Sequence, residues 1–327
     1  MEEKNREKEG EAVLAIVPKQ LVIVGAGNVG EAIAYTLMVR VQANDIVLID
    51  LNEDRAKGAA LDIAHGTSFF KQVSIRQGGY EECADAKLII ITAGVARKPG
   101  QSRLDLAKTN VSIVKSITEN IMRYADNPLI LVVSNPADIT TATVQEVSGL
   151  PVKRVIGSGT SLDTARFRYI LSQKLDVNVE DVNAYVLGEH GDSQVPIFSS
   201  ANVGGFPLDE YCRQSGVELD KEEIARKTRE GGAEVIKFKG ATFYGVAMAV
   251  SSIVETIVKD DRAILPVCHV LGDRFGEWAR VPISMPCRIG WNGIEKTFQI
   301  SMNDEERQAM EKSVQVLKDF MKQVRNA

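Results

Sequence analysis

One of the three histidines in the chain lies in a sequence suited to acid–base chemistry. His190 occurs in "LGEHGDS", a loop between glycines that directly follows an apolar run. Catalytic residues often lie on such loops. An imidazole can donate and accept a proton near neutral pH, as the interconversion of an alcohol and a carbonyl requires. His65, in a predicted helix, and His269, in an apolar run, are instead predicted to be structural.

Two charged residues in "SLDTAR" could complete such a site. Asp163 and Arg166 are three positions apart, so they share one face of a helix. A buried Asp163 could hold the imidazole of His190 in one tautomer and favour its charged form. The guanidinium of Arg166 could bind a carboxylate with two parallel hydrogen bonds. From the spacing alone, however, an ordinary ion pair on a helix surface is the favoured alternative.

A second group of residues indicates a dinucleotide site. "VGAGNVG" places Gly25, Gly27 and Gly30 in the pattern G-x-G-x-x-G, after a predicted strand and before a predicted helix. Such glycines allow backbone N–H groups to approach a pyrophosphate at the helix N-terminus. Asp50 follows Gly30 by 20 positions, as recognition of a ribose 2′-hydroxyl requires. Asp50 would repel a 2′-phosphate and no cation follows before Arg55, so NAD is predicted rather than NADP; the alternative is a glycine-rich turn that binds nothing.

The elements that must position these residues alternate along the first half of the chain. Four apolar runs predict buried strands, and three segments between them predict helices. The strands are expected in 20–27, 45–50, 87–94 and 128–136, and the helices in 28–40, 53–68 and 105–125. Because each strand is apolar throughout, the pattern predicts an α/β fold, a Rossmann doubly wound parallel sheet covered on both faces.

The second half of the chain has a different pattern, which predicts an α+β substrate domain. Helices are expected in 161–175, in 221–259 with a break near Gly240, and in 303–324, and an antiparallel hairpin is expected around Asn292-Gly293. We therefore predict a mobile N-terminal arm (1–18), an NAD-binding domain (19–150) and a substrate domain (151–327).

Composition excludes several classes of function. The net charge of −5 over 327 residues offers no broad basic face for nucleic acid. No apolar run has the length of a membrane span, and the acidic, mixed-charge start does not resemble a secretory signal. The cysteines are far apart and form no CxxC pair, which argues against a zinc site or a disulfide framework, predicts no metal and suits the cytoplasm. They are Cys83, Cys212, Cys268 and Cys287.

Four motifs in a fixed order resemble the lactate/malate dehydrogenase family. They are "GAGNVG" between strand and helix, "VVSNPAD", "GSGTSLDTARFR" and "GEHGDS". The resemblance extends from about residue 20 to the C-terminus. "GSGTSLDTARFR" and "GWNGIEKTFQISMNDEE" are most similar to bacterial L-lactate dehydrogenases.

The resemblance implies a role for each matching residue. His190 is expected to be the proton donor and acceptor, with Asp163 as its orienting partner. Arg166 is expected to bind the C1 carboxylate of a small 2-oxo or 2-hydroxy acid, Asn135 to contact the substrate oxygen and the nicotinamide, and Arg103 to polarise the reacting carbonyl from a loop that closes over the site. NAD carries the hydride, since no side chain can. The expected cofactor-binding residues are Gly25, Gly27, Asn28, Val29, Gly30, Asp50, Arg55, Thr92, Ala93, Gly94, Asn110, Val133 and Asn135.

The identity of the substrate depends on the stretch "ARKPGQSRLDL". Arg97 lies where malate dehydrogenases have an arginine that faces a second carboxylate and lactate dehydrogenases have glutamine. An enclosed carboxylate without a counter-charge would be unfavourable by several kcal/mol, so Arg97 favours malate/oxaloacetate. Thr242 matches the lactate type and supports the alternative, lactate/pyruvate. A further alternative makes Arg97 a solvated cation that never contacts substrate.

Other readings are weaker. A 2-hydroxyisocaproate-type enzyme would place a branched alkyl chain beside Arg97, a poor neighbour. A non-catalytic NAD-binding scaffold would be free to lose the catalytic set, which is complete here. Arg168 matches an arginine of members activated by a sugar bisphosphate, but Asn183 replaces the partner histidine and weakens that expectation. The family is usually dimeric or tetrameric, and a homotetramer is favoured.

Overall fold

The computed structural model describes residues 20–41, 43–70, 72–96 and 102–325. The arm predicted at 1–18 and the specificity residue Arg97 lie outside the described residues.

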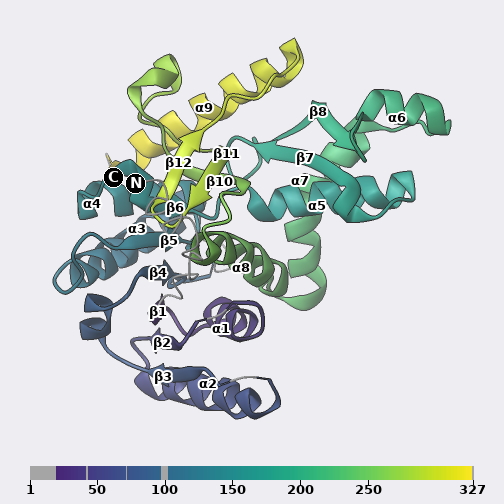
Figure 1. Ribbon diagram of the computed structural model, residues 1–327. Helices are drawn as coiled ribbons and strands as arrows, with labels where there is room; N and C mark the ends of the chain where they lie inside the picture. The colour runs from purple at the N-terminus through teal and green to yellow at the C-terminus, as the bar shows by residue number, and fades with distance from the viewer. Residues whose placement is uncertain (1–19, 42, 71, 97–101, 326–327) are drawn as a thin grey trace, which may run out of the picture.

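A nine-stranded sheet forms the centre of the molecule, in the order β12-β11-β10-β6-β5-β4-β1-β2-β3 (Figure 1). Its parallel part consists of β1 (Gln20–Val24), β2 (Asp45–Ile49), β3 (Ser74–Gln77), β4 (Leu88–Ile91), β5 (Leu129–Val132) and β6 (Val155–Gly157). The chain order reverses at β1, which pairs with β2 on one side and with β4 on the other, and ligands bind at such a switch point. The predicted Rossmann fold is confirmed.

Both faces of this sheet are buried, which explains why its strands are apolar throughout. On β1, Leu21 and Ile23 belong to one hydrophobic core, while Val22 and Val24 belong to another. Helices cover the two faces and connect the strands. These helices are α1 (Asn28–Arg40), α2 (Glu53–Gly66), α3 (Arg103–Ile121) and α4 (Ala137–Ser148).

The predicted hairpin around Asn292-Gly293 is confirmed, and it extends the same sheet. β10 (Ile264–Val270), β11 (Pro282–Gly290) and β12 (Gly293–Thr297) pair antiparallel, and Gly293 adopts a φ of 93° at the turn. One bridge, between Cys268 and Gly157, joins β10 to β6. The sheet therefore continues across the predicted domain boundary at residue 150.

A smaller sheet with its own helices lies beside the large one, on the right in Figure 1. It consists of β7 (Val182–Leu187), β8 (Val195–Val203) and β9 (Phe206–Pro207). The helices of this half are α5 (Ser161–Leu175), α6 (Leu208–Ser215), α7 (Lys221–Lys239), α8 (Tyr244–Lys259) and α9 (Asp304–Arg325). The predicted break at Gly240 is confirmed, because α7 ends there with a φ of 84°. Short 3₁₀ helices occur at Thr67–Phe69, Tyr80–Ala84, Val152–Arg154, Val179–Asp181 and Asp273–Trp278.

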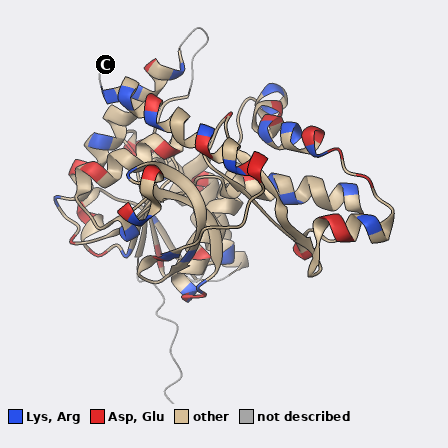
Figure 2. Ribbon diagram, turned by 90° about the horizontal axis from the view of Figure 1, so that it is seen from above, with Lys and Arg blue, Asp and Glu red and all other residues tan. Residues whose placement is uncertain are grey.

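The sequence analysis did not predict the strands β3, β6, β8 and β9 or the helices α4 and α6. β3, "SIRQ", is short and largely polar, and β8, "VPIFSSANV", has a polar centre. None of these four strands has an apolar run as long as those that predicted the remaining strands. In Figure 2, lysine and arginine are interspersed with aspartate and glutamate along the helices. No helix among the described residues is both long enough and apolar enough to cross a membrane.

Candidate active site

A cleft of 560 Å³ lies where β1, β2 and β4 end. Seven of the residues predicted to bind the cofactor line it: Gly25, Gly27, Asp50, Arg55, Thr92, Ala93 and Gly94. Tyr80, Ile113 and Ile117 also line it and were not predicted. They come from a 3₁₀ helix and from α3, where nothing in the sequence distinguishes a cleft-lining apolar residue from a core residue.

The glycines of the first turn are required by close packing. Gly25 has a φ of 113°, and a Cβ on Gly30 would lie 1.8 Å from the carbonyl oxygen of Gly25. Gly27 is the N-cap of α1. It has no side chain that could accept a hydrogen bond from the N–H groups of the first turn, which begins at Asn28 and Val29. A pyrophosphate would satisfy these N–H groups and interact favourably with the helix dipole, so this turn fits NAD.

Asp50 lies at the end of β2 with both oxygens engaged by main chain. Oδ2 accepts from the N–H of Ala26 at 2.7 Å, and Oδ1 accepts from the N–H of Asn52 at 2.9 Å. These bonds fix the carboxylate at the cleft while each oxygen keeps a second lone pair. Arg55 is paired with Glu31 at 3.2 Å, so its charge is already compensated. This arrangement favours a ribose 2′-hydroxyl over a 2′-phosphate.

Asn110 joins two loops at the nicotinamide end of the predicted site. Its Oδ1 accepts from the N–H of Val95 at 2.8 Å, and its Nδ2 donates to the carbonyl of Asn135 at 2.7 Å. The Asn135 side chain is exposed, and Val133 is buried with its N–H bonded to β4. Asn110 therefore holds the main chain at Val95 and Asn135 in place. Direct contact of Asn110, Val133 and Asn135 with a cofactor stays a prediction.

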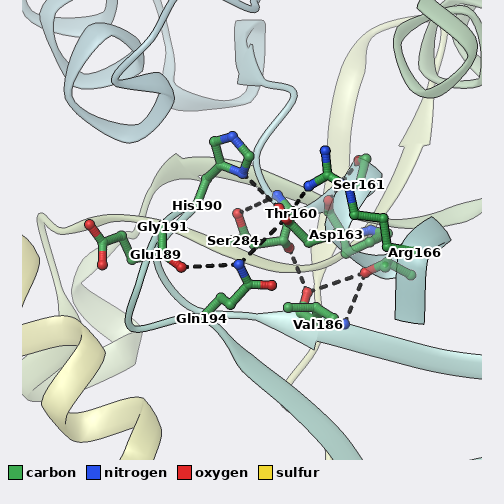
Figure 3. A network of polar contacts seen from close by, with 12 residues as sticks. Thr160, Ser161, Asp163, Arg166, Val186, Glu189, His190, Gly191, Gln194 and Ser284 are labelled. Atoms are coloured by element: carbon green, nitrogen blue, oxygen red, sulfur yellow. Dashed lines mark hydrogen bonds and ion pairs between the residues drawn. The ribbon is translucent and has the colours of Figure 1, made fainter. Parts of the chain in front are cut away.

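The residues predicted to handle the proton and the carboxylate meet in space. His190 Nδ1 lies 2.6 Å from Asp163 Oδ2, and Arg166 Nη1 lies 3.0 Å from Asp163 Oδ1 (Figure 3). The side chain of Asp163 is 2% exposed. The alternative of an ion pair on a helix surface is therefore wrong, because one buried carboxylate holds both cations.

The main chain around these residues is held by β11. The hydroxyl of Ser284 accepts from the N–H of Thr160, just before α5 begins, at 3.1 Å. The backbone of Ser284 exchanges two hydrogen bonds with Gly188, just after β7 ends, at 3.1 and 3.2 Å. One strand thereby fixes the start of the helix that carries Asp163 and the loop that carries His190 (Figure 3).

The electrostatics favour a protonated imidazole. Burial alone would lower the pKa of His190, but the charge and hydrogen bond of Asp163 and the charge of Asp138 outweigh it and raise the pKa to about 9. Burial opposes ionisation of Asp163 as well, yet His190 and Arg166 hold its carboxyl pKa below the ordinary range. With Nδ1 engaged, Nε2 is the ring nitrogen left for a substrate.

Three residues next to these motifs were not assigned to the site from sequence. Asp138 is 2% exposed and accepts from the N–H of His190 at 2.8 Å; burial raises its carboxyl pKa to about 6. Gln194 donates to the carbonyl of Gly191 at 3.0 Å. Glu189 pairs with Arg103. The two carboxylates belong to the recognised motifs "VVSNPAD" and "GEHGDS", which is the signal that could have indicated them.

The remaining predicted substrate residues are less closely assembled. Arg103 is the first residue of α3, and its side chain is 45% exposed. Thr242 lies half-buried in the turn between α7 and α8, helices that both pack on α5, which carries Arg166. Arg166 is 18% exposed and passes beside Gly232 of α7.

His269, predicted to be structural, is buried. Burial lowers the pKa of its imidazole to about 4, and Nε2 lies 2.9 Å from the Thr297 hydroxyl.

Comparisons with known proteins agree with this geometry. The family model for the lactate/malate dehydrogenase NAD binding domain matches residues 19–157, and the model for the family's alpha/beta C-terminal domain matches residues 160–327. The L-lactate dehydrogenase of Acetivibrio thermocellus is 43% identical over 94% of this chain and 97% of the relative. L-lactate dehydrogenase 1 of Clostridium acetobutylicum is 40% identical over 92% of this chain and 97% of the relative. The crystal structure of a minor L-lactate dehydrogenase from Enterococcus mundtii superposes with a TM-score of 0.90 at 41% sequence identity. The match covers 93% of this chain and 98% of that chain.

The cofactor cleft and the buried His190–Asp163–Arg166 cluster therefore occur in a chain that matches one family over almost all of its described length. The predicted cofactor, NAD, and the predicted class of enzyme are confirmed. The chain belongs to the lactate/malate dehydrogenase family and is an NAD-dependent 2-hydroxy-acid dehydrogenase.

Proposed function

We propose that this enzyme interconverts L-lactate and pyruvate. The observation that carries this choice is the similarity, over more than nine-tenths of the chain, to relatives named L-lactate dehydrogenase. Thr242, the lactate-type residue, supports it. The relatives thus favour the alternative of the sequence analysis over its first choice, malate.

The site residues divide the chemistry between them. NAD, when bound in the cleft, supplies or accepts the hydride. During reduction, His190 donates a proton from Nε2 to the carbonyl oxygen, and during oxidation it takes the proton back. The negative charge of Asp163, 2.6 Å from Nδ1, stabilises the imidazolium and fixes the tautomer of the neutral ring.

Arg166 is placed to bind the C1 carboxylate. Only its Nη1 is bonded to Asp163, at 3.0 Å, so the other edge of the guanidinium retains two parallel N–H donors. A carboxylate held there would lie beside the His190–Asp163 pair, because Asp163 contacts both cations. Arg166 would thereby direct the carbonyl next to the carboxylate toward the imidazole.

A second candidate, L-malate and oxaloacetate, is favoured by one observation, the identity of Arg97. A guanidinium enclosed beside the methyl group of pyruvate would lack a partner, whereas the second carboxylate of oxaloacetate would pair with it. The lactate proposal therefore requires that the Arg97 side chain stays hydrated when substrate is bound.

A comparison of two substrates decides between the candidates. We expect wild type to have a higher kcat/KM for pyruvate than for oxaloacetate, and Arg97→Gln to change this ratio by less than about threefold. The adjacent cation supplies the matched control, Lys98→Gln. A wild-type preference for oxaloacetate that Arg97→Gln, but not Lys98→Gln, shifts toward pyruvate by about 100-fold or more would establish malate instead.

We also propose that the enzyme is a cytoplasmic homo-oligomer, with a tetramer favoured over a dimer. Large apolar side chains remain exposed on one side of α1 and α8: Tyr35 (56%), Tyr244 (68%) and Met248 (49%). Tyr35, Tyr244 and Met248 line a common groove of 620 Å³. A second copy of the chain would bury this surface, and sedimentation velocity would measure the number of subunits.

The four free cysteines support the proposed cytoplasmic location, because thiols stay reduced in that compartment.

A further inference from the structure

Glu189 directly precedes His190, yet its side chain points away from the imidazole (Figure 3). The side chain is 2% exposed. Oε2 accepts from the N–H of Ser193 at 3.2 Å and from the Ser193 hydroxyl, and the N–H of Glu189 donates to the Ser313 hydroxyl of α9 at 2.8 Å. Oε1 accepts from Arg103. The carboxylate is therefore fixed by its own loop and by α9, with one oxygen directed at a cation from another element.

Arg103 reaches this carboxylate from the first turn of α3. The helix start is fixed by Ser102, whose hydroxyl accepts from the N–H of Asp105 at 3.0 Å. The guanidinium carbon lies 5.1 Å from the centre of the Phe320 ring on α9, and Nη1 lies 4.0 Å from Asp192 Oδ2. Despite these neighbours the side chain is 45% exposed, so part of the guanidinium remains free for another partner.

The loop leaves space for this contact only because it has a glycine at position 191. A Cβ on Gly191 would lie 2.8 Å from Glu189 Oε1 and 3.1 Å from Arg103 Nη2. Both distances are shorter than ordinary van der Waals contact. The ion pair thus occupies the space directly above the residue that follows His190.

Burial makes the two partners unequal. Among the described residues, Arg103 is the one cationic side chain that pairs with Glu189. If Arg103 left, a fully buried carboxylate would lose its counter-charge, which is strongly unfavourable. If instead Arg103 stays, its remaining N–H donors can still serve a substrate, because a guanidinium carries five. Burial of Glu189 therefore favours the paired state, and the pair leaves N–H donors of Arg103 available to a substrate.

We propose that Glu189 is a positioning residue for Arg103: its carboxylate fixes the direction in which the guanidinium faces the reacting carbonyl. This inference rests on the proposed function and on the role that the family resemblance implies for Arg103, polarisation of that carbonyl. Glu189 itself contacts neither substrate nor cofactor and acts through Arg103. It couples α3, the His190 loop and α9 at one point.

Steady-state kinetics of the full chain, with NADH and pyruvate and then with oxaloacetate, tests the proposal. We expect Glu189→Gln to lower kcat for the better substrate by about 100-fold, the cost of misplacing a catalytic group by about 1 Å. The dissociation constant of NADH should stay within about twofold of wild type, because the cofactor cleft is separate. Asp192→Asn is the matched control: it removes the other carboxylate near Arg103, whose side chain is 95% exposed, and should change kcat by less than about threefold.

A double-mutant cycle distinguishes positioning from a structural role. In the Arg103→Gln background, Glu189→Gln should lower kcat little further, since its target is absent. An equal loss in both backgrounds would overturn the inference, as would a Glu189→Gln enzyme with wild-type kcat. Either result leaves the proposed function intact as long as Arg103→Gln alone is impaired. Wild type without activity on either 2-oxo acid would instead refute the proposed function.

Two further variants apply if Glu189→Gln fails to fold. Gly191→Ala keeps the charge of Glu189 but places a methyl group against the ion pair, and should lower kcat while NADH binding is retained. Glu189→Asp keeps a carboxylate on a shorter side chain and should recover part of the activity. Full activity in Gly191→Ala, with the ion pair demonstrably displaced in a crystal structure, would also overturn the inference.

Discussion

The cofactor cleft and the proton-transfer site are built in different ways. Gly25, Gly30 and Asp50 belong to one β–α–β unit, and the cleft depends mainly on main chain. In the proton-transfer site, Asp163 and His190 are 27 positions apart, and Arg103 and Glu189 are 86 apart. Side chains from separate elements meet there, and buried charges hold them together. The cofactor site is thus specified locally and the substrate site by tertiary structure.

This difference predicts how the two regions respond to substitution. Main-chain hydrogen bonds survive the loss of one side chain, so the cofactor cleft should weaken gradually. Removal of one member of a buried charged cluster leaves its partners unpaired and should have large effects. The two sites should also be separable, since no residue that lines the cleft belongs to the His190–Asp163–Arg166 cluster.

The largest effect is expected from His190→Asn. Asparagine can donate a hydrogen bond but cannot release a proton at neutral pH, so kcat should fall by about 1,000-fold or more. NADH binding, measured by fluorescence titration, should change by less than about twofold if the two regions are separable. His65→Asn, at an exposed position on α2, is the control and should leave both quantities unchanged. Unchanged turnover in His190→Asn would refute the assignment of the proton donor.

A smaller effect is expected on the cofactor side from Asp50→Asn. The substitution removes the charge that would accept from a ribose hydroxyl and one of the two bonds to main chain, at Ala26 or Asn52. We expect the KM for NADH to rise by about 10-fold to 100-fold, with kcat little changed, and the preference for NADH over NADPH to shrink. Asp54→Asn, an exposed acidic residue at the start of α2, is the matched control. A collapse of kcat in Asp50→Asn would show that the two regions are coupled after all.

The same contrast explains what could be predicted from the sequence. The Rossmann sheet and the glycine turn follow from apolar runs and a fixed spacing, which are local properties. Spacing alone favoured a surface ion pair for Asp163 and Arg166; only the resemblance to a known family indicated that Asp163 meets His190. Nothing in the sequence indicated that Ser284 of β11 would fix the main chain next to both Asp163 and His190.

The missed strands β3 and β8 and the missed residue Glu189 share one physical cause. β8 and β3 are half-polar strands, so their pairing partners, and not their composition, determine that they form. Glu189 was missed although it precedes His190, because its partner Arg103 is remote in sequence. Burial of a carboxylate is visible only after folding, and that burial is what gives Glu189 and Asp138 their importance.

The smallest and sharpest effect concerns the second carboxylate near His190. The charged groups that face the imidazole are Asp163, Asp138 and Arg166, and the two carboxylates raise its pKa, to about 9. Carbonyl reduction needs the protonated ring, so kcat/KM for the 2-oxo acid should fall as the pH rises through this pKa. In Asp138→Asn one negative charge is lost, the pKa of His190 should drop, and this falling limb should move to lower pH by less than about one unit.

The acid side of the same pH profile separates charge from structure. Because burial raises the pKa of Asp138 to about 6, its carboxyl is neutral below that pH, and asparagine imitates the neutral form. Wild type and Asp138→Asn should therefore have similar kcat/KM at acid and neutral pH, where His190 is protonated in both, and should diverge only as the pH approaches the lowered pKa of His190. A uniform loss at every pH would mean that Asp138 acts only through its 2.8 Å bond to the N–H of His190. Charge and hydrogen bond, which are inseparable in a static structure, would then be distinguished by a single pH profile.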